Sequence, residues 1–291
     1  METGFSILIQ VAAMGCKMAD LRIGFLDVGH GDFIYATTPL GANLIIDVGT
    51  GDVVPSIFLS EISAISELQV SHPHTDHFDD IIAISKKNIA SFRCPSLDGF
   101  TDDRIGWTKR DKAKIAKLRQ MRREIAADNE AVTVGQEFDH TVWFPPNVDI
   151  NDPNTASALT TLAFKGVKIL LGGDLPASGW KDLLNNSKFV GAITGTTIFK
   201  VPHHGRSEGC CNELFDVITP MLCVISDKSI EKDNKNTAAT KWYSDRTTGC
   251  IVAGCKDKRK VVSTRSDGSI FIKINDKGEW WVHPGTRWLR D

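Results

Sequence analysis

Around its densest group of histidines the sequence reads Gln69-Val70-Ser71-His72-Pro73-His74-Thr75-Asp76-His77-Phe78-Asp79-Asp80, with the ligand-type spacing H-x-H-x-D-H. An apolar run precedes this group and isoleucines at helical spacing follow it, which predicts a strand, a sharp turn and a helix. Side chains alternate along an extended segment, so His72, His74 and Asp76 are expected to face one side while His77 opens the helix. Imidazole and carboxylate groups that converge are ligands of divalent cations. The group therefore predicts a metal site, against the alternative of a solvated polar loop.

Two further predicted strands end in residues of the same ligand type. The strand expected at 167–171 runs into Gly172-Gly173-Asp174, and the one at 196–201 ends in Pro202-His203-His204-Gly205. An aspartate after two glycines is more often a turn residue. Five of the eight histidines lie in these three places, so we expect Asp174 to be a ligand as well.

The order of the remaining patterns indicates the fold class. Strands expected at 21–26, 43–46, 221–226 and 250–253 alternate with helical periodicity at 55–66, 180–184, 212–218 and 237–245. This alternation predicts one α/β domain, which we place at 19–291. Residues 1–18 are expected to be an N-terminal tail.

Composition excludes several classes of protein. The 291 residues are 42% hydrophobic and 24% charged, with a net charge of −2, as in ordinary soluble domains. No apolar run reaches the length of a membrane span, and the mildly apolar residues 5–15 lack the basic start of a secretory signal. Seven cysteines without a C-x-x-C pair favour free thiols in a reducing cytoplasm. We therefore expect a cytoplasmic protein.

Two residues beside predicted strands stand out. His30 is flanked by Gly29 and Gly31, which indicates a tight turn that holds the imidazole in place. Asp47 ends a buried strand before Gly49, and we expect it to organise the backbone or support a ligand rather than bind metal itself.

Nine basic residues fall between Arg104 and Arg123, with only Asp111 opposing them. Apolar residues at spacings of three and four predict an amphipathic helix with a basic outer face. One interpretation is a solvated helix surface, and the other is a surface that tracks phosphates. The expected nucleic-acid contacts are Lys109, Arg110, Lys114, Lys117 and Arg122.

Six blocks in order resemble the metallo-β-lactamase fold superfamily, and within it the domain at the end of ComEC-type competence proteins, in its stand-alone form. The blocks are Phe25-Leu26-Asp27-Val28-Gly29-His30-Gly31-Asp32, Leu44-Ile45-Ile46-Asp47, Ser71-His72-Pro73-His74-Thr75-Asp76-His77, Leu170-Leu171-Gly172-Gly173-Asp174, Lys200-Val201-Pro202-His203-His204-Gly205 and Thr264-Arg265-Ser266-Asp267-Gly268-Ser269-Ile270. The resemblance implies a four-layer αβ/βα sandwich with metals at one edge.

The resemblance also implies a ligand set for two divalent ions, Zn²⁺ or Mn²⁺. His72 and His74 would bind one ion, Asp76 and His77 the second, and Asp174 would bridge them. His203 or His204 would complete the second site, and His203, nearer the strand end, is preferred.

One departure from the superfamily concerns the first ion. Many members carry a further histidine before the bridging aspartate, whereas His140 is the only histidine in that interval and opens a predicted strand. Asn154 or Ser157 would lie near the first metal instead. A single tightly bound metal, or two only with substrate, therefore stays open.

These features favour a metal-dependent nuclease or phosphodiesterase that cleaves nucleic acid with a metal-activated hydroxide, oriented by Asp76. His30 and Lys200 are candidates to protonate the leaving oxygen or neutralise the phosphate, and a protein in a defence or repair system is a candidate partner. The alternatives are a hydrolase of a small ester, thioester, lactone or lactam, and a non-catalytic regulatory module. The superfamily fold alone does not choose among them.

Overall fold

The computed structural model describes residues 20–101, 105–127, 138–228 and 238–285. The expected tail at 1–18 and Arg104 lie outside these ranges. Within them, no helix has both the length and the apolar character needed to cross a bilayer.

Seven strands form the first sheet, in the order β13-β12-β1-β2-β3-β4-β5. They are β13 (Trp280–Pro284), β12 (Ile270–Ile274), β1 (Leu21–Phe25), β2 (Ile34–Thr37), β3 (Asn43–Ile46), β4 (Ala64–Gln69) and β5 (Asn88–Arg93). Pairing is antiparallel from β13 to β3, and it becomes parallel between β3, β4 and β5.

Six strands form the second sheet, in the order β11-β10-β9-β8-β7-β6. They are β11 (Val261–Ser263), β10 (Leu222–Ile225), β9 (Ile198–Lys200), β8 (Val167–Leu171), β7 (Leu159–Phe164) and β6 (Phe138–Trp143). Strands β8 to β11 run parallel, whereas β6, β7 and β8 are antiparallel.

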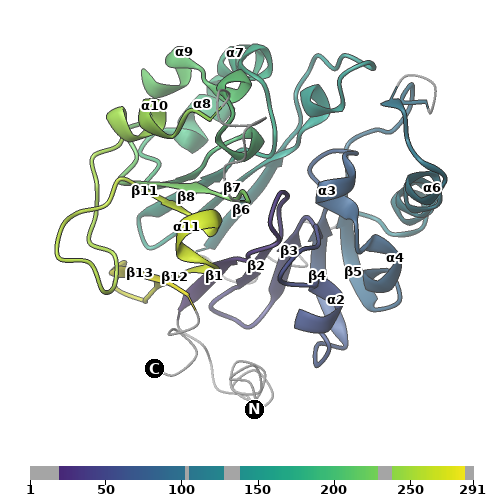
Figure 1. The fold of residues 1–291 in the computed structure, drawn as a ribbon, viewed down its shortest axis with the longest axis horizontal. Coiled ribbons are helices and arrows are strands. Elements are labelled where there is room, and N and C mark those ends of the chain that lie inside the picture. The colour runs from purple at the N-terminus through teal and green to yellow at the C-terminus, as the bar shows by residue number, and fades with distance from the viewer. Residues whose placement is uncertain (1–19, 102–104, 128–137, 229–237, 286–291) are drawn as a thin grey trace.

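Most of the described helices cover the outer faces of the two sheets, whereas α11 (Thr264–Asp267) connects β11 of one sheet to β12 of the other and lies between them (Figure 1). The others are α2 (Pro55–Phe58), α3 (Thr75–Phe78), α4 (Ile81–Ile84), α6 (Lys109–Glu124), α7 (Ala177–Leu184), α8 (Ser187–Ile193), α9 (Asn212–Phe215) and α10 (Thr240–Asp245), with short 3₁₀ helices η1 (Pro153–Ala156), η2 (His203–Gly205) and η3 (Ser207–Gly209). Figure 1 shows α7 to α10 gathered on one side and α2, α4 and α6 on the other.

Three apolar clusters hold these layers together. One lies between the sheets, where Ile23 of β1 and Leu162 of β7 are both buried. A second joins the first sheet to α4 and α6, and a third joins the second sheet to α7, α8, α9 and α10. The architecture is therefore a four-layer αβ/βα sandwich, as the family resemblance implied.

The prediction of a helix at 55–66 is wrong for most of these residues. Helix α2 ends at Phe58, and the chain re-enters the first sheet as β4 at Ala64. Ile57 is 69% exposed, so the periodicity that it shared with Ile62 and Ile65 does not mark one buried helical face. Parallel pairing of β4 with both β3 and β5 buries Ile65 instead.

The loops after several strands meet at one edge of the sandwich. Strand β4 leads into His72 and α3, β8 into Asp174, and β9 into η2. Parallel strands of a sheet present their carboxyl ends at the same edge, which is where open α/β sheets collect ligand-binding residues. The fold thus brings the three distant ligand-type motifs together.

Candidate metal centre

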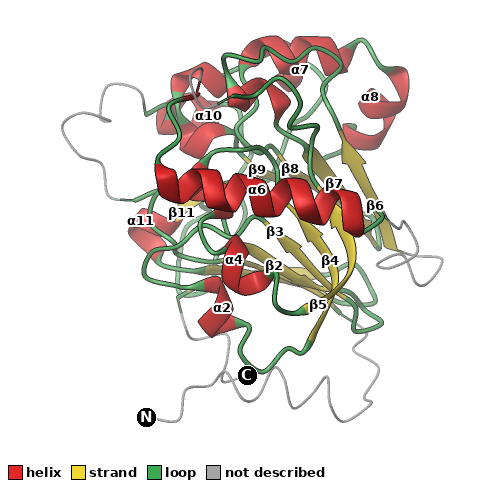
Figure 2. Cartoon of the chain, turned by 90° about the vertical axis from the view of Figure 1, so that its right-hand side faces the viewer, coloured by secondary structure: helices red, strands yellow, loops and turns green. Residues whose placement is uncertain are grey.

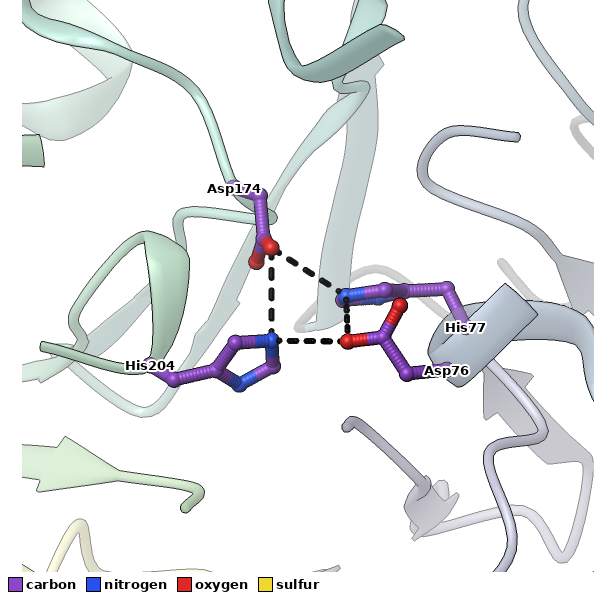
Figure 3. A group of neighbouring side chains, drawn as sticks. All are labelled: Asp76, His77, Asp174 and His204. Atoms are coloured by element: carbon purple, nitrogen blue, oxygen red, sulfur yellow. Dashed lines mark ion pairs between the residues drawn. The ribbon is translucent and has the colours of Figure 1, made fainter. Parts of the chain in front are cut away.

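Four side chains from these loops converge on one point: Asp76, His77, Asp174 and His204 (Figure 3). Oδ2 of Asp174 lies 3.3 Å from Nε2 of His77 and 3.3 Å from Nε2 of His204. Oδ2 of Asp76 lies 3.3 Å from Nε2 of His204 and 3.8 Å from Nε2 of His77. Two carboxylate oxygens and two imidazole nitrogens therefore face one another.

These distances fit a divalent ion. Ligand atoms around a tetrahedral Zn²⁺ with bonds of about 2.0–2.1 Å lie about 3.3–3.4 Å apart. Nε2 of His77 and Nε2 of His204 are buried and have no hydrogen-bond partner within the described part of the chain. Buried nitrogens are seldom left without a partner, so a cation at this point would account for both.

Each of the two histidines is oriented by a contact of its other nitrogen. Nδ1 of His77 lies 2.7 Å from Oδ2 of Asp47, and Nδ1 of His204 lies 2.9 Å from the carbonyl oxygen of Ser226. An N–H donated from Nδ1 leaves Nε2 with a lone pair directed at the centre. Asp47 is also held by the backbone N–H and the hydroxyl of Ser71, as expected for a supporting residue.

The backbone is closely packed where it carries Asp76. A Cβ atom added at Gly31 or Gly49 would lie 2.4 or 2.2 Å from the carbonyl oxygen of Asp76, so neither position accepts a larger residue without a shift. The backbone N–H of Asp32 donates to the same oxygen, and that of Val48 donates to the carbonyl of His77. The loops around Gly31 and Gly49 therefore fix α3.

Burial and charge act in opposite directions on these groups. Burial favours the neutral acid, but His77 and His204 hold the pKa of Asp174 well below its ordinary value. Burial opposes protonation of His204, yet Asp174 raises its pKa to about 10. The pKa of His77 is likewise raised despite burial, by Asp174 and Asp47. Without a metal ion, the carboxylates therefore attract protons to the same nitrogens that would bind the ion.

His72 and His74 lie beside the group of four. Nε2 of His72 is 3.1 Å from Nδ1 of His74 and 3.8 Å from Oδ2 of Asp174. Burial lowers the pKa of both imidazoles, which keeps them neutral and able to bind metal. Oδ2 of Asp174 thus lies near His72 as well as His77 and His204, and the bridging role that the resemblance implies for Asp174 stays a prediction.

The loop at η1 contacts the backbone of Asp174 and lies beside the candidate metal centre. The backbone N–H of Asp174 donates to Oγ of Ser157 at 3.1 Å. Oδ1 of Asn154 is buried and lacks a hydrogen-bond partner within the described ranges. His140 lies elsewhere, with Nε2 at 2.7 Å from Nε2 of Gln69 and 3.4 Å from Oε1 of Glu67.

The structure differs from the preference for His203 over His204. It is Nε2 of His204 that faces Asp76 and Asp174, while His203 is partly exposed. Both residues adopt a left-handed backbone with φ of 50°, which turns the chain sharply between them. The alternation of side chains along β9 therefore does not continue through His203 and His204, and it does not predict which of them faces the centre.

Lys200 does not lie where it could neutralise a phosphate or protonate a leaving oxygen, the two roles considered for it from the sequence. It is fully buried, and its ammonium contacts the Asp32 carboxylate and the carbonyl oxygen of Gly173. Burial disfavours the ammonium form, but Asp32 raises the pKa of Lys200. A second group of candidate ligands, Asp32, Asp47 and His77, lies here, and the ammonium of Lys200 already contacts Asp32 in it.

The placement of α6 shows that part of the predicted nucleic-acid surface, Lys114, is wrong. It carries a capping box between Thr108 and Asp111 and lies across the first sheet, against α4 and β5 (Figure 2). Lys114 is 3% exposed and its ammonium pairs with Asp79, so it cannot meet a nucleic acid. Lys109 and Arg110 are exposed.

The other two expected contacts on α6 also have internal partners. Lys117 is half-buried and donates to Oε1 of Gln120 at 2.7 Å. Arg122 is exposed, and its Nε lies 3.4 Å from the carbonyl oxygen of Cys94.

The structure adds residues that sequence reasoning missed. Asp227 follows β10 and contacts His30, with Nδ1 of His30 at 3.0 Å from Oδ1 of Asp227. Asp32 pairs with Lys200. Asp227 follows the end of the strand expected at 221–226, and this position after a predicted parallel strand was a usable signal.

Comparisons with known proteins identify no family for this chain. A scan against models of protein families finds no match, and a search of curated proteins finds none. Solved structures give similarities at 12–13% identity. CmlA, a diiron β-hydroxylase from Streptomyces venezuelae, has a TM-score of 0.45 at 13% identity over 70% of this chain and 44% of its own. A candidate metal-dependent hydrolase from Parabacteroides distasonis has a TM-score of 0.46 at 12% identity over 84% and 92%.

A third similar structure is a protein of unknown function from Enterococcus faecalis, with a TM-score of 0.33 at 13% identity over 62% of this chain and 49% of its own. The chain spans less than half the length of CmlA. The fold assignment therefore rests on the sheet order and the layers, and the candidate site rests on its side-chain geometry.

Proposed function

We propose that this protein is a metal-dependent phosphodiesterase that acts on nucleic acid. The observation that carries the metal dependence is the set of four ligand-type atoms that all lie within 4.8 Å of one another, two of them nitrogens buried without hydrogen-bond partners in the described part of the chain. A divalent ion in such a site lowers the pKa of water and stabilises negative charge on a phosphoryl oxygen. Asp76, His77, Asp174 and His204 would hold it.

The residues around the site divide into a buried wall and an open side. The side chains of His72, His77 and His204 are fully buried, and that of Asp174 nearly so, while the Asp76 side chain is 28% exposed. Substrate would therefore approach across Asp76. Its carboxylate would orient water toward the phosphorus atom, while Asp47 and Ser226 keep the two histidines in place.

Positive charge beside the open side supports a phosphodiester substrate. Helix α6 reaches the end of α3, where Lys114 pairs with Asp79, the residue directly after α3. The exposed side chains of Lys109 and Arg110 begin the same helix about one turn before Lys114. They therefore lie on the side of the molecule where α3 carries Asp76 and His77. Nucleic acid would lay its backbone along such a surface, since phosphate contacts provide most of its non-specific affinity.

A specific observation favours a second function, hydrolysis of a small ester, thioester or lactam. An apolar cavity of about 620 Å³ lies beside the loop after β5. Its walls include Phe92, Cys94, Phe100, Phe144 and Ile150. The neighbouring strand β4 leads to His72, so an apolar substrate held there would lie near the candidate metal centre. Cavities of this size and character commonly bind small molecules.

One experiment separates these functions. Chelator-treated protein would be reloaded with Zn²⁺ or Mn²⁺ and incubated with labelled single- and double-stranded DNA and RNA, and with chromogenic esters and cephalosporins. We expect cleavage of nucleic acid by the wild type and by Asp245→Asn, a surface control, but not by Asp174→Asn. Ester turnover without nucleic-acid cleavage would favour the second function. Cleavage that survives in Asp174→Asn would reject the assigned centre.

A further inference from the structure

His30 lies at the open side of the metal centre without belonging to the group of four. Its Nε2 is 3.6 Å from Oδ2 of Asp76, and its ring centroid is 4.2 Å from that of His204. Its side chain is 37% exposed. An imidazole in this position can meet a substrate that approaches across Asp76.

The other ring nitrogen of His30 is anchored by Asp227. Nδ1 of His30 lies 3.0 Å from Oδ1 of Asp227, whose side chain is completely buried. Arg265 contacts Oδ2 of Asp227 at 3.1 Å, and Arg206 lies 3.6 Å from Oδ1. The hydroxyl of Thr264 accepts from the backbone N–H of Asp227 at 2.9 Å. The two arginines fix the carboxylate and Thr264 fixes the backbone that carries it, so Asp227 can hold the imidazole in one orientation.

This arrangement repeats that of the two histidines in the group of four. In His30, His77 and His204 alike, Nδ1 contacts an oxygen behind the ring while Nε2 faces Asp76. His77 and His204 also face Asp174, whereas the described contacts of His30 include Asp76 alone among the grouped acids. Its Nε2 therefore remains available to a substrate.

We infer that His30 is a catalytic residue that gives a proton to the leaving oxygen of a phosphodiester, and that Asp227 is its positioning residue. This inference rests on the proposed function. A carboxylate behind an imidazole sets its tautomer and the orientation of the ring, the arrangement that general-acid histidines use. No other described imidazole combines partial exposure, a buried carboxylate partner and contact with Asp76.

Atoms and electrons balance in this step. A hydroxide derived from water forms a new bond to phosphorus, and the bond between phosphorus and the leaving oxygen breaks with its electron pair on that oxygen. The proton on Nε2 of His30 moves to the leaving oxygen and gives an alcohol. The proton released when the water formed hydroxide returns the imidazole to its starting form, so one water is consumed for each bond cleaved.

The test compares substrates that differ in their need for a proton. His30→Gln should lower kcat on DNA by about 100-fold or more, because the alkoxide leaving group requires protonation. The same variant should hydrolyse bis(p-nitrophenyl) phosphate at close to the wild-type rate, because nitrophenolate leaves without a proton. Equal losses on both substrates would overturn the inference.

Metal affinity tests a different role for His30. If His30 only meets substrate, His30→Gln should bind Zn²⁺ as tightly as the wild type in a chelator competition. A loss of affinity would make His30 a metal ligand and overturn the assignment. This measurement needs no activity, so it stays informative if the wild type cleaves neither DNA nor the nitrophenyl ester, an outcome that would reject the proposed function itself.

Asp227 has its own readout. In the wild type, ¹⁵N–¹H correlation spectra should show the His30 proton on Nδ1 in the neutral form, and Asp227→Asn should change that pattern. Asp227→Asn should reduce kcat on DNA with little change in KM, and Asp227→Glu should recover part of the loss. An unchanged tautomer with an unchanged kcat would reject the positioning role, and matching circular dichroism spectra would show that the variants fold.

Discussion

Nδ1 of His77 lies 2.7 Å from Oδ2 of Asp47, which ties the end of β3 to the candidate metal centre. Asp47 adopts a left-handed backbone with φ of 60°, and Ser71 donates two hydrogen bonds to its carboxylate. One buried aspartate thus orients an imidazole and joins the loops after β3 and β4. Both roles depend on its being an acceptor.

Replacing Asp47 by Asn should weaken metal binding without unfolding the protein. Asparagine tolerates a left-handed backbone, so the loop is kept, but its amide does not enforce the required tautomer of His77. Loss of such a supporting group typically costs 10–100-fold in metal affinity, and we expect a decrease of about that size. Competition with a fluorescent chelator measures it, with Asp245→Asn as the surface control. Unchanged affinity would contradict the role.

Replacing Lys200 by Met should lower the free energy of unfolding by about 3–5 kcal/mol, the usual cost of leaving one partner of a buried ion pair alone. The Asp32 carboxylate is buried and would be deprived of the ammonium that it contacts. Urea unfolding of metal-free protein measures the change, with the exposed Lys188→Met as control. Adding Asp32→Asn to Lys200→Met should recover part of the stability, and a neutral effect of Lys200→Met would contradict the pairing.

The thiols of Cys94 and Cys223 should resist modification in the folded protein. Burial raises the pKa of each to about 12. At pH 8 about one thiol in 10⁴ would then be thiolate, and this fraction rises tenfold with each pH unit up to the pKa. Reaction with a disulfide reagent should therefore be slow at pH 8, faster at pH 10, and rapid in denaturant. Peptide mapping identifies the sites, and rapid labelling at pH 8 in the native state would contradict the shift.

The alternation of strands and helices predicted an α/β domain, and the family resemblance implied the sandwich. Because β8 and β9 are parallel neighbours, Asp174 and the 203–204 pair meet at one edge of the second sheet. His72 to His77 follow β4 of the first sheet and reach that edge only through the packing of the two sheets, which strand order does not contain. The choice between His203 and His204 depends on two successive left-handed residues, which neither residue type signals. Spacing alone could not resolve that choice.

Two of the positions that sequence reasoning misjudged or missed, Ile65 and Asp227, depend on partners that lie far away in the sequence. Ile65 belongs to a strand because β3 and β5 flank it, and local periodicity does not contain that information. Asp227 meets His30 across 197 residues. Lys114 could have been found, because it shares a helical stripe with Leu118 and Met121, four and seven residues on, and that stripe faces the core.

Charge on α6 gives the last prediction, because exposed and buried cations of one helix should behave differently. Lys109→Gln with Arg110→Gln should weaken binding to duplex DNA and flatten the plot of log affinity against log salt by about 0.9 for each phosphate that the variant no longer neutralises. Lys114→Met should leave that slope unchanged and instead lower thermal stability, because Asp79 would be without its ammonium partner.

Lys188→Gln, on α8, is the matched surface control. Fluorescence anisotropy with a non-cleaving metal measures binding. If Lys114→Met changed the slope as much as the Lys109→Gln and Arg110→Gln variant does, the distinction between exposed and buried cations of α6 would be wrong. A slope unchanged in all three variants would show that α6 does not bind DNA.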